Sequence, residues 1–162
     1  MSDTLSAWHD VPPGTKATTH VTVTVRGDGS AIALPVAIVR GDRPGRTLLV
    51  LAGVHGDEFE GMRAIHQVFA SLEPAGLRGT FVAVPVANPP AFEAGLRVNP
   101  DDRQDLARVF PGDPAGTVTE QIAHVLTHRF IRHVDLLCDL HSAGGNYAMP
   151  ALSGYSLQPE PL

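Results

Sequence analysis

Three short apolar runs alternate with helix-like segments through the middle of this chain. The runs cover residues 47–52, 81–86 and 134–140. Continuous apolar runs of this length are typical of strands that are buried on both faces of a sheet. Residues 58–72 place apolar side chains at helical spacing, and residues 117–133 form a second expected helix. The alternation of strands and helices predicts an α/β fold with a largely parallel sheet.

A hairpin precedes this alternating region. Residues 19–26 and 31–39 have the composition of strands, and the Gly-Asp-Gly-Ser sequence between them is a turn signal. Such a hairpin would make the sheet mixed. Residues 1–18 are expected to form a flexible lead-in, which leaves residues 19–162 as the folded domain. Residues 88–116 show little periodicity, and a connection of this length inside a compact domain is usually functional.

Composition argues against several classes of partner. The chain has 162 residues, a net charge of −5 and no run of Lys or Arg, so nucleic acid and anionic membranes are not expected as partners. No apolar run reaches the length of a membrane span. The single cysteine, Cys138, excludes an internal disulfide and is compatible with a cytoplasmic location. Because Cys138 lies within an apolar run, we expect a buried, unreactive thiol.

Two short segments carry the chemistry of this chain. The sequence GVHGDE at residues 53–58 offers His55 and Glu58, and the sequence DLH at residues 139–141 offers His141. Each segment directly follows an expected strand, where open α/β sheets bind their ligands. Two imidazoles and one carboxylate, with an open fourth position for water, form a catalytic zinc set. The two segments therefore predict a site for one zinc ion per chain.

A second histidine pair is the competing metal site. His124 and His128 lie four residues apart, so they share one face of the expected helix. The glutamate of an H-E-x-x-H motif is missing, because Val125 follows His124. Histidines near the C-terminus of a helix also interact favourably with the helix dipole. We therefore expect this pair to be solvated or to interact with the dipole.

Four motifs occur in an order that resembles one family. They are LAGVHGDE at residues 51–58, NPPAF at 88–92, DLARVFPG at 105–112 and DLHS at 139–142. On these motifs the chain resembles the succinylglutamate desuccinylase/aspartoacylase family, which is related to the zinc carboxypeptidases. The resemblance implies a three-layer α/β/α sandwich around a mixed, mostly parallel sheet. It also implies hydrolysis of an amide bond in an N-acyl amino acid or a related small molecule.

The resemblance implies roles at the metal. His55, Glu58 and His141 match the zinc ligands of the family. Asp105 matches a carboxylate that orients the first histidine, because a metal-bound imidazole usually donates its other N–H to an acceptor. In such a site zinc lowers the pKa of its bound water, and a glutamate takes the proton and passes it to the leaving amine.

Other residues match the family's substrate contacts. Arg108 matches an arginine that binds the substrate carboxylate, a task suited to a planar guanidinium. Arg97 matches the arginine that stabilises the oxyanion, with Arg103 as the competitor for this role. Asn88, which opens the NPPAF motif, is expected to contact the substrate.

Two departures from the family pattern affect these expectations. The family motif D-L-N-R has Ala107 in its third position here, which predicts an altered substrate contact. The family's general base is a glutamate well downstream of D-L-H, and the only acidic residue after His141 is Glu160, whose context does not match. We therefore expect residues 19–162 to be the N-terminal portion of the catalytic domain, truncated at the C-terminus and with little or no activity alone.

Two alternatives remain open at this point. The first is a zinc carboxypeptidase-like peptidase that cleaves peptides in place of acyl amino acids. The second is a catalytically inactive metal-binding or interaction module, which Ala107 and the missing glutamate favour. Apolar surface left exposed by a missing C-terminal half would also favour a homo-oligomer.

Overall fold

The computed structural model describes residues 8–145 and 147–155, which form a mixed five-stranded sheet in the order β1-β2-β4-β3-β5. The strands are β1 (Thr15–Val25), β2 (Ala31–Arg40), β3 (Arg43–Ala52), β4 (Arg78–Val84) and β5 (Leu136–Leu140). β2 pairs antiparallel with β1 and with β4, whereas β3 pairs parallel with β4 and with β5. The carboxyl ends of β4, β3 and β5 therefore meet at one edge of the sheet.

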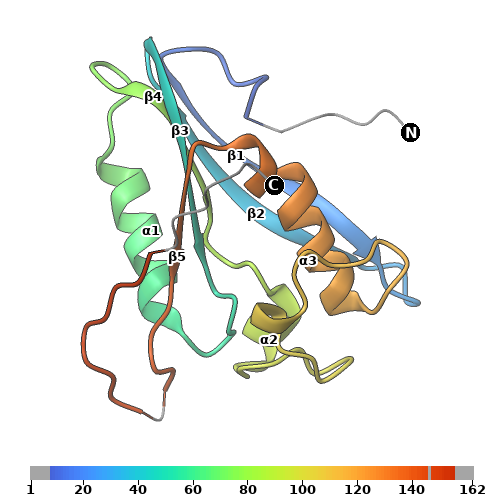
Figure 1. The fold of residues 1–162 in the computed structure, drawn as a ribbon. Coiled ribbons are helices and arrows are strands. Elements are labelled where there is room, and N and C mark those ends of the chain that lie inside the picture. The colour runs from blue at the N-terminus through green and yellow to red at the C-terminus, as the bar shows by residue number, and fades with distance from the viewer. Residues whose placement is uncertain (1–7, 146, 156–162) are drawn as a thin grey trace.

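Helices cover both faces of this sheet (Figure 1). Helix α1 (Phe59–Ser71) lies on one face, and α2 (Pro89–Ala94) and α3 (Val118–Arg129) lie on the other. Two 3₁₀ turns, η1 (Leu106–Arg108) and η2 (Ile131–His133), flank α3 in the chain. The predicted three-layer α/β/α architecture is confirmed. None of the described helices is long and apolar enough to cross a bilayer.

The alternation of side chains along β3 builds two separate apolar cores. Leu49 and Leu51 point into the core beneath α3, whereas Val50 and Ala52 point into the core beneath α1. Successive residues of a strand face opposite sides of a sheet, so an uninterrupted apolar run is what a strand covered on both faces requires. This packing holds the end of β3, and the loop that follows it, in a defined position.

The long connection between β4 and α3 contains more structure than its sequence predicted. Asn88 caps α2, with Pro89 and Pro90 in the first turn, and Asp105 caps η1. A proline at the start of a helix is a known signal, because its missing N–H has no intrahelical partner there. The sequence of this segment shows little periodicity because helices of six and three residues are too short to produce any.

The expected flexible lead-in does not extend to residue 18. Residues 1–7 lie outside the described residues. Trp8 and Val11 are buried in the core on the α3 side, where the Trp8 ring lies 5.5 Å from the ring of Phe130. β1 begins at Thr15. Burial of a large aromatic side chain fixes this segment, so the folded unit includes residues 8–18.

The expectation that residues 134–140 are buried is wrong for β5. Leu136 and Leu137 are 53% and 46% exposed, and Cys138 is an exposed free thiol. The reason is topological, because β5 is an edge strand and pairs with β3 alone among the described strands. Leu137 borders a cavity of about 430 Å³ beside α3. The expectation that Cys138 is buried is therefore also wrong, whereas its reactivity stays a prediction.

Candidate metal centre

His55 lies in the tight loop that joins β3 to α1. Gly53, with a φ of 67°, lets the chain turn directly after β3. Gly56 lies so close to the backbone of Ala91 in α2 that a Cβ would overlap it. The two glycines hold the His55 side chain at the carboxyl end of the parallel strands, where it is only 4% exposed.

Glu58 occupies the N-cap position of α1, but its side chain does not cap the helix. The carboxylate instead faces His55 and His141, and it is 3% exposed. The backbone amide of Ser142 donates to Glu58 Oε2 at 2.9 Å. A buried carboxylate that gives up a capping bond needs compensating partners, and the two imidazoles and this amide provide them.

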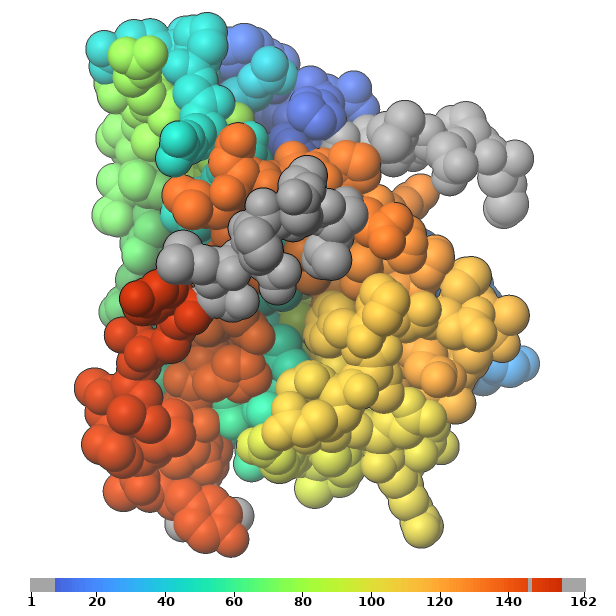
Figure 2. All heavy atoms as spheres, viewed as in Figure 1, coloured from blue at the N-terminus to red at the C-terminus, as the bar shows by residue number. Residues whose placement is uncertain are grey.

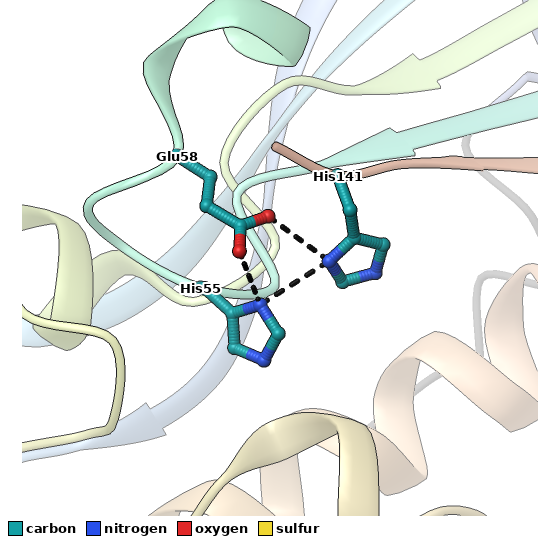
Figure 3. Close-up of side chains that lie close together, drawn as sticks. All are labelled: His55, Glu58 and His141. Carbon is teal, nitrogen blue, oxygen red and sulfur yellow. Dashed lines mark hydrogen bonds and ion pairs between the residues drawn. The ribbon is translucent and has the colours of Figure 1, made fainter. Parts of the chain in front are cut away.

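His141 follows the last residue of β5 and brings the third side chain to the same point (Figure 3). Its Nδ1 lies 3.2 Å from Nδ1 of His55 and 3.0 Å from Oε2 of Glu58. Glu58 Oε1 lies 2.9 Å from Nδ1 of His55. The three side chains, predicted from the sequence as a set, thus form a cluster that can hold a metal ion.

The cluster is partly open to solvent. In Figure 2 the chain around residues 50–60, coloured teal to green, is visible between residues 136–155 in red and the yellow connection around residues 88–110. His141 is 32% exposed, in contrast to the buried His55 and Glu58. The cluster is therefore open to solvent on the side of His141.

A carboxylate lies behind each histidine. Asp105 Oδ1 is 3.2 Å from Nε2 of His55, as the family resemblance implied. Asp139 Oδ2 is 2.9 Å from Nε2 of His141, a contact for which no role was predicted. The signal was present in the D-L-H motif, because residues two apart on a strand point to the same face. Both imidazoles thus direct Nδ1 to the cluster and Nε2 to a carboxylate.

The surroundings shift the pKa values of two of these groups. The hydrogen bond with Asp139 raises the pKa of His141, and the charges of Asp139 and Glu58 add to this effect, while burial opposes it. Burial also opposes the shift at Asp105, but the amide of Ala107 and the neighbouring His55 and Arg97 lower the pKa of Asp105. Asp105 is therefore a charged carboxylate that contacts Nε2 of His55.

Arg97 is the arginine that the structure brings to the cluster. Its Nη1 lies 3.4 Å from Glu58 Oε1, its Nη2 lies 3.8 Å from Asp105 Oδ2, and the side chain is 52% exposed. Arg103 is exposed, has a φ of 60°, and has no described contact with the cluster. This placement favours Arg97 over Arg103 for contact with a substrate.

The two predicted substrate-binding residues lie apart from the cluster. Arg108 is exposed, and its guanidinium donates to the carbonyl oxygen of Ala107 at 3.4 Å. Asn88 is fully buried, where its side chain accepts from Ala91 N and donates to the carbonyl oxygen of Val54. The contact of Asn88 with Val54 helps to fix the loop that carries His55. The substrate contacts of both Arg108 and Asn88 stay predictions.

The rival histidine pair lacks the features of the cluster. The rings of His124 and His128 stack at 4.1 Å, and Nδ1 of each is buried without a hydrogen-bond partner. A metal on Nε2 would leave both Nδ1–H groups without the acceptor that metal-bound histidines normally have. Burial and the charges of His124, Arg132 and His133 lower the pKa of His128. The described structure therefore gives no support to a second metal site there.

Comparison with known proteins identifies the relatives of this chain. Residues 44–162 match the model of the succinylglutamate desuccinylase/aspartoacylase catalytic domain. The chain belongs to the succinylglutamate desuccinylase/aspartoacylase family. The resemblance inferred from the four motifs is thereby confirmed. Both this family and the deacetylase described next are named for deacylases, which agrees with amide hydrolysis as the predicted class of activity.

Three relatives illustrate this membership. The chain is 43% identical over 115 residues to the N-alpha-acetyl-L-2,4-diaminobutyric acid deacetylase of Halomonas elongata, a match that covers 70% of this chain and 33% of the relative. An aspartoacylase family protein from Mesorhizobium loti has 35% identity and a TM-score of 0.75, over 86% of this chain and 43% of that one. The product-bound ectoine utilization protein EutE (DoeB) from Ruegeria pomeroyi has 34% identity and a TM-score of 0.70, over 82% and 42%. The chain thus spans less than half the length of these relatives.

Proposed function

We propose that this chain carries the metal-binding part of a zinc-dependent amide hydrolase. The main support is the convergence of one ligand atom each from His55, Glu58 and His141, at separations of 2.9, 3.0 and 3.2 Å. Ligand atoms about 2.0 Å from a tetrahedral zinc ion lie about 3.3 Å apart, so the present spacing is close to what zinc needs. Two histidines and one glutamate also form a donor set that catalytic zinc uses.

The residues around the cluster have separate tasks in this proposal. A bound zinc ion would polarise the scissile carbonyl and lower the pKa of a water molecule. Asp105 holds His55 in the orientation that directs Nδ1 to the metal. Arg97, beside Glu58 and half exposed, stabilises the negative charge that develops on the substrate oxygen.

The proton transfer needs a further group. Among the described residues, the carboxylates that contact the cluster histidines are Glu58, Asp105 and Asp139. Each is already hydrogen-bonded to a histidine, so none is free to take a proton from water and deliver it to an amine. We propose that the general base comes from outside the described residues, and that this chain alone has little activity.

The name of one relative supports a substrate class for this proposal. The deacetylase of Halomonas elongata is named for an N-acetylated diamino acid. We propose an N-acyl amino acid or a similar small amide as the substrate. Ala107 stands where the family motif has an asparagine, so a polar side chain beside Arg108 is missing. The substrate contact at this position should therefore differ from that of the family motif. A cytoplasmic location, which the single cysteine favours, is part of the same proposal.

Zinc binding and hydrolysis test the proposal in two steps. Metal analysis of untagged protein should find one zinc ion per chain, lost in His55→Ala and His141→Ala and retained in His124→Ala. The gene product that contains this chain should then release acetate from N-acetylated amino acids, and His55→Ala should abolish this release. Equal zinc in the native chain and in His141→Ala would refute the metal site. Cleavage of C-terminal peptide bonds in place of N-acyl groups would favour a peptidase.

A further inference from the structure

Asp139 has one described side-chain partner, and that partner is a proposed metal ligand. Asp139 Oδ2 lies 2.9 Å from Nε2 of His141. The carboxylate is 38% exposed and lies on β5, the edge strand of the sheet. Charged side chains on edge strands are common because they prevent pairing with other chains, so exposure alone would not indicate a role at the metal. The contact with His141 is what distinguishes this residue.

The contact repeats the arrangement on the other side of the cluster. His55 presents Nδ1 to Glu58 and Nε2 to Asp105, and His141 presents Nδ1 to Glu58 and Nε2 to Asp139. The two carboxylates come from different parts of the fold, the N-cap position of η1 and strand β5, yet each binds the nitrogen that faces away from the cluster. The repetition shows that both imidazole rings are held from behind.

The contact between Asp139 and His141 affects how well Nδ1 of His141 can bind a metal. A carboxylate at Nε2 keeps the proton on that nitrogen, so the lone pair of Nδ1 is free for the metal. The charge of the carboxylate also makes the imidazole a better donor. The rings of His124 and His128, whose Nδ1 atoms lack any partner, show the contrast within the same chain.

We propose that Asp139 is a positioning residue that orients His141 and strengthens its bond to the metal. The inference rests on the proposed metal site. Asp139 and His141 lie two residues apart at the end of β5, so the strand itself sets their relative position. The side chain of Asp139 has no other described partner, so its replacement removes this contact without breaking a second one.

Zinc affinity in matched variants tests the proposal. Competition with a chromogenic chelator, at an alkaline pH where the imidazoles are neutral, should show a loss of about 10–100-fold for Asp139→Ala. Asp139→Asn should lose less, because the amide oxygen still accepts from Nε2–H but carries no charge. Cys138→Ala, on the same strand, and Glu73→Gln, an exposed carboxylate in the loop between α1 and β4, should bind zinc as the native chain does.

Two further measurements separate positioning from a structural effect. The visible spectrum of the Co²⁺-substituted protein should change in Asp139→Ala. At the same alkaline pH, where the proton-linked stabilisation by His141 is lost, the thermal unfolding of the metal-free variant should match that of the native chain. Native zinc affinity in Asp139→Ala would overturn the proposal, as would a loss of metal-free stability equal to the loss in affinity. His141→Ala serves as the reference. If His141→Ala also binds zinc normally, the metal site itself is refuted. If His141→Ala fails to bind zinc while Asp139→Ala binds it normally, only the role of Asp139 is refuted.

Discussion

The amide nitrogen of Ser142 lies 2.9 Å from Oε2 of Glu58 and donates a hydrogen bond to it. The residue directly after His141 thus fixes the carboxylate that precedes α1. The Ser142 hydroxyl also donates to Glu60 Oε2 at 2.6 Å, which lowers the pKa of Glu60. The end of β5 and the start of α1 are therefore joined by main-chain and side-chain contacts, so the position of Glu58 depends on β5 being in place.

The metal-free chain should lose stability as the pH rises above the ordinary pKa of histidine. The hydrogen bond with Asp139 raises the pKa of His141 above 6.5. A raised pKa in the folded state stabilises the fold below the unfolded pKa, and that contribution is lost as the pH rises through the folded pKa. Urea unfolding of chelator-treated protein over a pH series measures this. His141→Gln should flatten the trend, and a constant stability of the native chain over this range would contradict the prediction.

Zinc affinity should depend on pH in the opposite direction. A proton on His141 competes with the metal for the same imidazole, so affinity should rise as the pH rises through the raised pKa of His141. Chelator competition at several pH values gives the number of protons released on binding. An affinity that does not vary between mildly acidic and alkaline pH would show that His141 is not a ligand.

Gly56→Ala should destabilise the fold and weaken metal binding together. A Cβ at this position would overlap the backbone of Ala91 and Phe92, which cannot move aside as a flexible side chain can. Overpacking of this kind costs about 1–3 kcal/mol. The loop that carries His55 or helix α2 would have to shift. Chemical denaturation and zinc titration measure both effects. Gly145→Ala is the control, because its Cβ would meet nothing within 4 Å, and equal behaviour of the two variants would refute the prediction.

Arg97→Ala should reduce catalysis far more than metal binding. In the gene product that contains this chain, loss of one oxyanion-stabilising group is expected to lower kcat/KM by about 10²–10³-fold. Zinc content should stay near normal, because Arg97 contacts Glu58 at 3.4 Å from a half-exposed position. Arg103→Ala is the matched control. A larger catalytic loss in Arg103→Ala than in Arg97→Ala would transfer the role to Arg103.

Cys138 should react quickly with a thiol reagent while the chain is folded. The thiol is free and exposed on the edge strand β5. Reaction with dithionitrobenzoate should approach the rate of the urea-unfolded protein, because no unfolding step is required. A thiol that reacts only after unfolding would show that β5 is covered in solution.

The metal cluster was predictable because its geometry follows from strand order. His55 and His141 each follow a strand, and β3 and β5 are parallel neighbours, so their carboxyl ends meet. Glu58 lies three residues beyond His55, close enough to turn back toward it. Local sequence signals and one fold-level rule were therefore sufficient to assemble the three side chains.

Other features depend on information that local patterns do not contain. The apolar run of β5 indicates burial on both faces, but its exposure depends on which strands and helices lie beside it. The burial of Trp8 requires a contact with Phe130, more than a hundred residues away. Arg97 and Arg103 could not be separated in the sequence, because the path of the connection between α2 and η1 decides which side chain reaches Glu58.

The distance along the chain between His55 and His141 gives the metal a mechanical role. These residues are 86 positions apart, and β5 is held to the sheet by β3 alone among the described strands. An ion bound to both would act as a cross-link that closes a long loop, which removes conformational freedom that the metal-free chain retains. Chelation should then loosen β5 before the rest of the sheet, so that hydrogen exchange along one edge strand reports whether the ion is present.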